Sequence, residues 1–344
     1  MEKFLIVRLS SLGDIIHTLP AFQALRKNYP DAKITWIVEE KGKQILDMVP
    51  GIDHVFAFQL KGKSLFSTRF WKEIRKLLKS IRDREQTAID FQGLIKSGML
   101  CFLSRAKRRL GFNRENLREK SASWFYTETL DKIDENMHVI RKNLKLLNLL
   151  GIHEEKYEFP LVISPDLKEM ANILLTGLGF SGNKKIVLFN VGAAWETKLW
   201  PSEKWTELIN QLLKERKDIF PLILWGNESE KKISDEVRMH TEATAVPLLS
   251  LQKAVALINQ ADLVVSGDTF ALQAACALFR PVVGIFGPTN PRRNGPFRPQ
   301  DKVVFHEIEC SYCYKRTCAK RLCLEKITPE ETAHLILQSL EENE

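Results

Sequence analysis

The sequence predicts an α/β protein built from two tandem Rossmann-like domains, each with a doubly wound parallel sheet. Short runs of apolar, β-branched residues alternate with longer segments in which apolar residues recur at helical spacing. This alternation begins twice, first at Phe4 and again near Lys185. A chain of 344 residues is also long enough for two domains of ~100–200 residues each.

The first series of elements lies before residue 92. Its apolar runs are nearly continuous, which is typical of strands whose two faces are both covered by helices. The predicted strands are Phe4–Arg8, Lys33–Val38, Val55–Phe58 and Thr87–Phe91, and the predicted helices are Ile15–Asn28, Gly42–Met48 and Phe70–Arg82.

The second series follows a stretch rich in proline and glycine, residues 151–183, which we interpret as a linker with one helix. We expect one domain over residues 1–165, a second over 166–327 and a C-terminal helix within 328–344. Ligands of such sheets bind beyond the carboxyl ends of the strands, and here also in the cleft between the domains. The predicted strands are Lys185–Asn190, Pro221–Trp225, Leu263–Ser266 and Pro281–Phe286, and the helices are Ser202–Arg216, Ser229–His240, Leu251–Gln260 and Thr269–Leu278.

Charge is distributed unevenly along the chain. Residues 1–150 carry 28 Lys and Arg against 17 Asp and Glu, whereas the remainder carries 23 against 26. The basic half indicates an anionic partner, or only a solvated basic face. Nothing resembles a DNA-recognition helix or an aromatic RNA-binding surface, so we expect no nucleic acid partner. No run approaches the roughly 20 apolar residues of a membrane span, and no signal peptide is recognisable, which predicts a cytoplasmic protein.

The first strand-to-helix loop contains Ser10-Ser11-Leu12-Gly13-Asp14. It lacks the Gly-x-Gly-x-x-Gly spacing of dinucleotide sites and the lysine of a P-loop. Asp14 could be the N-cap of the following helix, because aspartate accepts hydrogen bonds from free backbone N–H groups there. Its position beyond a strand's carboxyl end makes a general base the competing interpretation.

Three loops of the second half offer groups to an anionic nucleotide. The small-residue turn before Lys198 can direct backbone N–H groups and an ammonium at a phosphate, or be an ordinary loop. Glu230 follows a strand end, where a carboxylate can accept from ribose hydroxyls or simply begin a helix. Asp268 and Thr269 precede a helix whose N-terminus suits a diphosphate.

These loops together resemble the ADP-heptose:lipopolysaccharide heptosyltransferases, glycosyltransferase family 9, and most closely those of the inner core. The resemblance covers nearly the whole chain. The chain departs from the family pattern in two places: Phe270 and Gln273 stand in place of a glycine and a histidine, and Ala193 and Ala194 in place of the Thr or Ser residues often found before the lysine. The motifs that carry the resemblance are Val7–Pro20, Trp36–Glu40, Asp90–Ser97, Arg118-Glu119 with Ala122–Tyr126, Lys198–Pro201, Trp225-Gly226, Asp268-Thr269 and Phe286–Thr289.

The resemblance implies a GT-B fold, an inverting mechanism that requires no cofactor, and Asp14 as the base. It implies transfer of heptose from ADP-heptose to a Kdo residue of Kdo–lipid A at the cytoplasmic face of the inner membrane, with the enzyme associated peripherally. Alternatives are another core sugar or a protein as acceptor, or a degenerate member that binds nucleotide sugar without turnover. The implied donor-binding residues are Lys198, Glu230, Asp268, Thr269, Ser10, Gly13, Ala193, Ala194 and Gln273, and the implied acceptor-binding residues are Arg118, Lys61, Lys63 and His17.

Four of the six cysteines lie within one short basic segment near the C-terminus. Because a cytoplasmic location disfavours disulfides, a closed structural site for Zn²⁺ or iron is the leading interpretation. Redox-labile or disulfide-paired thiols and plain reduced cysteines are the alternatives. The four residues are Cys310, Cys313, Cys318 and Cys323.

Overall fold

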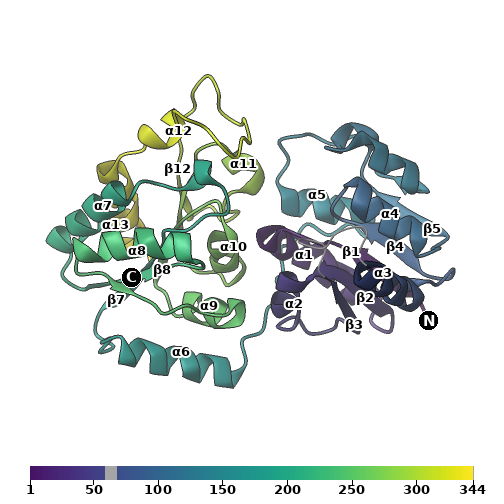
Figure 1. Ribbon diagram of the computed structural model, residues 1–344, viewed down its shortest axis with the longest axis horizontal. Helices are drawn as coiled ribbons and strands as arrows, with labels where there is room; N and C mark the ends of the chain where they lie inside the picture. The colour runs from purple at the N-terminus through teal and green to yellow at the C-terminus, as the bar shows by residue number, and fades with distance from the viewer. Residues whose placement is uncertain (59–67, 344) are drawn as a thin grey trace. The chain divides into compact units, whose positions relative to one another are not determined.

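The computed structural model describes residues 1–58 and 68–343 and divides into two compact units, Met1–Val162 and Ile163–Glu344. Each unit contains one six-stranded parallel sheet with helices between its strands (Figure 1). The prediction of two doubly wound α/β units is therefore confirmed. Among the described residues no helix is long and apolar enough to cross a membrane.

In the first unit, β1 is central and the chain winds outward from it in both directions. The sheet order is β3-β2-β1-β4-β5-β6, and Ile6 of β1 lies opposite both Trp36 and Ile89 on its two neighbours. This reversal of strand order beside β1 places the loops after β1 and β4 next to each other. The strands are β1 (Lys3–Val7), β2 (Lys33–Glu39), β3 (His54–Phe58), β4 (Thr87–Asp90), β5 (Arg108–Gly111) and β6 (Glu128–Thr129).

The helices of the first unit differ from the prediction chiefly at one boundary and by two additions. The first helix begins at Leu12, before the predicted Ile15, so that Asp14 lies inside it. The helices α4 and α5 were not predicted, and neither were the short outer strands, because β5 opens on two arginines in place of an apolar run. The helices are α1 (Leu12–Asn28), α2 (Glu40–Leu46), α3 (Thr68–Ile81), α4 (Ile95–Leu103) and α5 (Val139–Leu146).

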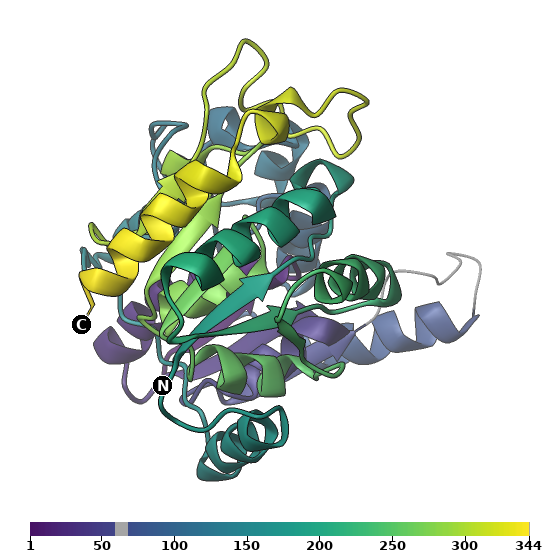
Figure 2. The ribbon, with the colours of Figure 1, turned by 90° about the vertical axis from the view of Figure 1, so that its left-hand side faces the viewer.

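The second unit repeats the same topology. Its sheet order is β12-β11-β10-β7-β8-β9, with β7 at the reversal point. Figure 2 shows the C-terminal helix, in yellow, running beside α7 over one face of this sheet. The elements are α6 (Pro165–Gly177), β7 (Lys185–Asn190), α7 (Ser202–Glu215), β8 (Ile219–Leu224), α8 (Glu228–Met239), β9 (Thr244–Ala245), α9 (Leu251–Ile258), β10 (Leu263–Gly267), α10 (Phe270–Ala277), β11 (Val282–Ile285), α11 (Pro291–Asn294), β12 (Lys302–Val304), α12 (Leu322–Glu325) and α13 (Pro329–Glu341).

Each core forms where apolar strands meet the helices on both faces. Leu5, Ile6 and Val7 of β1 are fully buried, as a continuous apolar strand requires. In the second unit Trp205 of α7 packs edge-on against Trp200, and both indoles join the cluster that α13 covers. Aromatic side chains of this size account for much of the apolar area that folding removes from water.

One glycine in the first unit allows a close approach that a larger residue would block. A Cβ on Gly111 of β5 would lie 2.2 Å from the ring of Tyr126, whereas a Cβ on Gly177, at the end of α6, would meet nothing within 4 Å. The Tyr126 ring therefore occupies the space that the missing side chain leaves.

We predict that Gly111→Ala lowers the free energy of unfolding by about 2 kcal/mol or more, because the new methyl group overpacks the Tyr126 ring. Gly177→Ala is the matched control and should be neutral or stabilising by up to about 1 kcal/mol, because alanine favours the helix. Urea unfolding of both variants measures the difference. Equal stability of the two variants would contradict the prediction.

Candidate active site

Asp14 lies in the first turn of α1, directly beyond the carboxyl end of β1. The helix is capped by Ser11, whose backbone N–H and hydroxyl donate to Oδ2 of Asp14 at 3.0 and 2.8 Å. The interpretation of Asp14 as the N-cap is therefore wrong, because Ser11 occupies that position and Asp14 lies three residues on. Its carboxylate faces back across the helix start and closes a capping box.

An arginine holds the second oxygen of Asp14. Nη2 of Arg8 lies 2.7 Å from Oδ1 of Asp14, and the side chains are 9% and 37% exposed respectively. Nη1 of the same guanidinium donates to the carbonyl oxygen of Phe91, at the end of β4. One arginine thus connects the loops after β1 and β4, and it leaves the carboxylate accessible on one side.

The surroundings of Asp14 keep its carboxyl group ionised. Burial opposes ionisation, but the positive charge of Arg8, the nearby His17 and the two hydrogen bonds from Ser11 outweigh it, so the pKa of Asp14 lies below the ordinary value of 3.8. The basic form is therefore present throughout the neutral range and is lost only as the pH falls through that lowered pKa.

The other predicted residues of the first unit are placed differently from one another. Ser10 and Gly13 are partly buried in the Asp14 loop, and Arg118 is exposed. His17 is only 4% exposed and packs edge-on against His138, which places it beneath the surface rather than on it. The predicted acceptor-binding residues Lys61 and Lys63 lie outside the described residues.

In the second unit, two of the predicted donor-binding residues, Lys198 and Asp268, form an ion pair with each other. Nζ of Lys198 lies 2.7 Å from Oδ2 of Asp268 and also donates to its carbonyl oxygen at 3.0 Å. The ammonium lies 4.5 Å from the centre of the Trp195 ring. This partly buried cation lies next to Thr269, the N-cap of α10, so two anion-stabilising features adjoin.

Asn190, at the end of β7, is a residue that sequence reasoning missed. Its Nδ2 lies within 3.1 Å of three oxygen atoms, which belong to Gly192, Ser266 and Thr269. It therefore holds together two loops: the donor loop, residues 191–198, and the loop around Asp268. The signal in the sequence was an amide at the very end of an apolar strand, where ligands of parallel sheets bind.

Glu230 and Gln273 have contrasting positions. The carboxylate of Glu230 accepts from the backbone N–H of Gly226 at 2.7 Å, and a Cβ on Gly192 would lie only 2.1 Å from it, so Glu230 extends over the donor loop. Gln273 is 3% exposed, and its amide donates to the carbonyl of Asn294 at 2.7 Å. In the donor loop itself, Ala193 is partly buried and Ala194 is exposed.

The cysteine segment contacts the same loops but does not assemble a metal site. All four of its thiols are free, and no three His, Cys, Asp or Glu side chains are grouped to hold an ion anywhere in the described part of the chain. The segment does touch the donor loop, because Thr197 donates to the carbonyl of Lys315 at 2.6 Å and the guanidinium of Arg316 lies 5.4 Å from the Trp195 ring.

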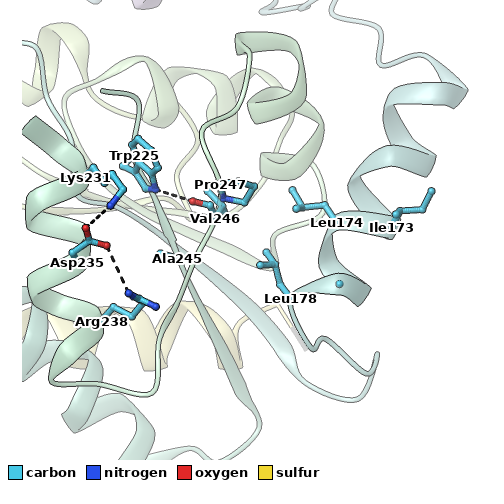
Figure 3. A pocket seen from close by; sticks show the side chains of 11 residues that line it. Ile173, Leu174, Leu178, Trp225, Lys231, Asp235, Arg238, Ala245, Val246 and Pro247 are labelled. Carbon is cyan, nitrogen blue, oxygen red and sulfur yellow. Dashed lines mark hydrogen bonds and ion pairs between the residues drawn. The ribbon is translucent and has the colours of Figure 1, made fainter. Parts of the chain in front are cut away.

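A separate pocket of about 660 Å³ lies between α6, α8 and the end of β9 (Figure 3). Its apolar walls include Leu174 and Val246, and its polar groups are paired with one another: Lys231 with Asp235, and the Trp225 indole N–H with a backbone carbonyl. None of the residues predicted to bind the donor or acceptor lines it.

Comparison with known proteins gives these sites a context. Residues 74–323 match the model of glycosyltransferase family 9 (heptosyltransferase). Lipopolysaccharide heptosyltransferase 1 of Campylobacter coli is 32% identical over 88% of this chain and 89% of its own, and the Escherichia coli K12 protein of the same name is 28% identical over 88% and 92%.

Solved structures agree with this. The E. coli heptosyltransferase WaaC with ADP has a TM-score of 0.78 and 26% identity over 99% of this chain and 100% of its own. A family 9 glycosyltransferase from Veillonella parvula shares the fold, with a TM-score of 0.81 at 20% identity over 99% of this chain and 97% of its own. The expectation of a GT-B fold is therefore confirmed. The chain belongs to glycosyltransferase family 9, the heptosyltransferases, and is a glycosyltransferase.

Proposed function

We propose that the enzyme transfers heptose from ADP-heptose to a Kdo residue of Kdo–lipid A, with inversion at the anomeric carbon and Asp14 as general base. The single observation that carries the proposal is the ionised, partly exposed carboxylate of Asp14, held at the end of β1. Similarity to proteins named lipopolysaccharide heptosyltransferase 1 and to WaaC with ADP-2-deoxy-2-fluoro heptose supports the donor and the pathway.

In this mechanism the oxygen of an acceptor hydroxyl attacks the anomeric carbon of heptose, and Asp14 removes the proton of that hydroxyl. The bond from that carbon to the diphosphate breaks on the opposite face, and its electron pair leaves with ADP. Asp14 then carries the proton. Because Arg8 and Ser11 fix both carboxylate oxygens, little reorganisation is needed as the proton arrives.

We assign the diphosphate to the loops around Lys198. Its ammonium and the N-terminus of α10 after Thr269 offset the negative charge that grows on the leaving ADP. Asp268 holds Lys198 in place before the nucleotide arrives. Glu230 is assigned to the ribose hydroxyls, for which its carboxylate retains acceptor capacity beside the single bond from Gly226.

The acceptor side is assigned to the first unit because of its basic excess and the exposed Arg118. Apolar side chains are also exposed there: Met99 and Phe102 lie on one face of α4, and Trp124 is 74% exposed. Arg109 lies over the Phe102 ring at 5.6 Å. Exposed aromatic groups beside basic residues suit the interface of an anionic membrane, so we propose peripheral association through this surface.

The sequence allows two alternatives to this function. One is a member that binds nucleotide sugar without turnover, in which Gln273, whose amide donates to the carbonyl of Asn294, would not contact the diphosphate. Transfer to another core sugar or to a protein is the other alternative, which acceptor assays separate. The structural metal stays a prediction, because Cys310 and Cys313 are exposed and the four thiols do not form a closed site.

We predict that Asp14→Asn lowers kcat at least about 1,000-fold with Kdo–lipid A as acceptor, because the amide cannot take the proton. Affinity for ADP-heptose, measured calorimetrically, should change little. Asparagine is preferred to alanine because its side-chain oxygen can still accept from Ser11. A variant that retains turnover would refute the assignment of the base.

We predict that Lys198→Met weakens ADP binding about 10- to 100-fold, which corresponds to the loss of one charge-assisted contact to phosphate. Lys302→Met is the matched control, because Lys302 is also an ion-paired lysine of the second unit, 2.9 Å from Glu342. Isothermal titration with ADP measures both. If the two variants bind ADP equally well, Lys198 does not hold the diphosphate.

We predict that Phe102→Ser and Trp124→Ser each lower the affinity for phosphatidylglycerol vesicles about tenfold, because each removes exposed apolar area from the interface. Ile173→Ser, which removes a side chain of similar exposure from α6 of the second unit, is the control. Co-sedimentation reports binding, and activity on a detergent-dispersed acceptor should be unchanged. Equal losses in all three variants would contradict the assigned surface.

A further inference from the structure

We propose that Tyr126 and Asp90 are positioning residues for the base Asp14, which they control through the loop after β4 and the guanidinium of Arg8. The inference rests on the proposed function of Asp14. It adds that the geometry of the base is set by side chains distant in sequence, which touch neither Asp14 nor a substrate. Four consecutive contacts, all within the first unit, make the connection.

The first contact is the guanidinium itself. Arg8 is buried, and its two terminal nitrogens have different partners: the carboxylate of Asp14 and the backbone carbonyl of Phe91. Its Nε has no partner among the described residues. A buried cation takes the geometry that its few acceptors allow, so the position of the Phe91 carbonyl helps to fix where Arg8 meets Asp14.

The second contact joins the two loops through their backbones and one amide. The backbone N–H of Phe91 donates to the carbonyl of Val7 at 3.2 Å. The side-chain oxygen of Gln92 accepts from the backbone N–H of Leu9 at 2.8 Å. Residues 91 and 92 therefore contact the chain on either side of Arg8, and a shift of their loop moves the acceptor of its guanidinium.

The third contact gives that loop its shape. Oδ1 of Asp90 accepts from the backbone N–H groups of Gln92 and Gly93 at 2.8 and 3.1 Å, a local turn that aspartate favours. Gly93 has φ of +71°, and a Cβ there would lie 2.6 Å from Leu117. Only glycine completes this turn without strain, so the loop depends on the orientation of the Asp90 carboxylate.

The fourth contact fixes Asp90. Its Oδ2 accepts from the hydroxyls of Tyr126 and Ser97 at 2.7 and 2.8 Å, and the residue is fully buried. Burial raises the pKa of Asp90 although its hydrogen bonds oppose the rise, and burial beside Asp90 raises the pKa of Tyr126, which therefore stays a hydrogen-bond donor. Loss of the Tyr126 hydroxyl leaves this buried carboxylate one donor short.

The experiment measures Asp14 directly, by ¹³C NMR of its side-chain carboxyl from pH 6.5 down to the lowest pH at which the protein stays folded, with Asp14→Asn to assign the resonance. The groups that act on this carboxyl are Arg8, His17 and Ser11. Arg8→Gln should raise the pKa of Asp14 by ~1–2 units, because the neighbouring positive charge is lost. Tyr126→Phe should raise the pKa of Asp14 by about half a unit and lower kcat about tenfold at unchanged KM, because the ion pair between Arg8 and Asp14 is displaced.

Tyr157→Phe is the matched control, because it removes a partly buried hydroxyl of the same unit that binds Arg141 instead. If Tyr126→Phe folds poorly, Gln92→Leu tests the same connection at the contact between Gln92 and Leu9. Arg8→Lys keeps a positive charge beside Asp14 and should therefore leave its pKa lower than Arg8→Gln does. If the pKa of Asp14 is unchanged in both Tyr126→Phe and Gln92→Leu, the inference is overturned. A changed pKa without a matching change in the acid limb of kcat/KM would support the connection and reject Asp14 as the base.

Discussion

The ion pair between Arg8 and Asp14 is the interaction on which the chemistry proposed for the first unit depends. A carboxylate at the end of a parallel strand loses part of its hydration, and without a cation its proton affinity would rise. The arginine supplies that charge from a buried position, which in turn requires acceptors for its remaining N–H groups. The base, the cation and the loop after β4 therefore form one connected arrangement. The same cation makes Asp14 a weaker base, so accurate placement must contribute more to the rate than proton affinity does.

The second unit solves the opposite electrostatic problem. Here the cation, Lys198, is the group that we propose to meet an anion, and Asp268 orients it through their ion pair. The indole of Trp195 stabilises the ammonium without competing for its hydrogen bonds. Asn190 then fixes the relative position of two loops that belong to neighbouring strands. Arrangements of this kind reduce the reorganisation that binding would otherwise require.

The sequence revealed the fold and the ends of the strands, but not the connections between loops. Asp14, Lys198 and Asp268 could be named as candidates because each lies in the segment between an apolar strand and the following helix, or in the first turn of that helix. Arg8 was read only as the end of a strand, because its partner Phe91 contributes a backbone carbonyl, which leaves no trace in residue type. Likewise, spacing alone suggested a metal site for the four cysteines, whereas the described residues form no group of three ligand side chains that could hold an ion. Residue types and spacing predict elements and chemistry, while contacts between distant segments depend on packing.

The capping box at the start of α1 has a consequence for the interpretation of related sequences. Asp14 accepts two hydrogen bonds from Ser11, and so the residue that would take the proton also satisfies the free N–H of its own helix start. Selection for folding alone would favour keeping it, because it closes the capping box of α1. A descendant that had lost all transferase activity would still be under pressure to keep this aspartate. The presence of this aspartate in a homologue therefore does not by itself indicate catalysis, and a lysine at the position of Lys198, to which we assign the diphosphate, is the more discriminating marker.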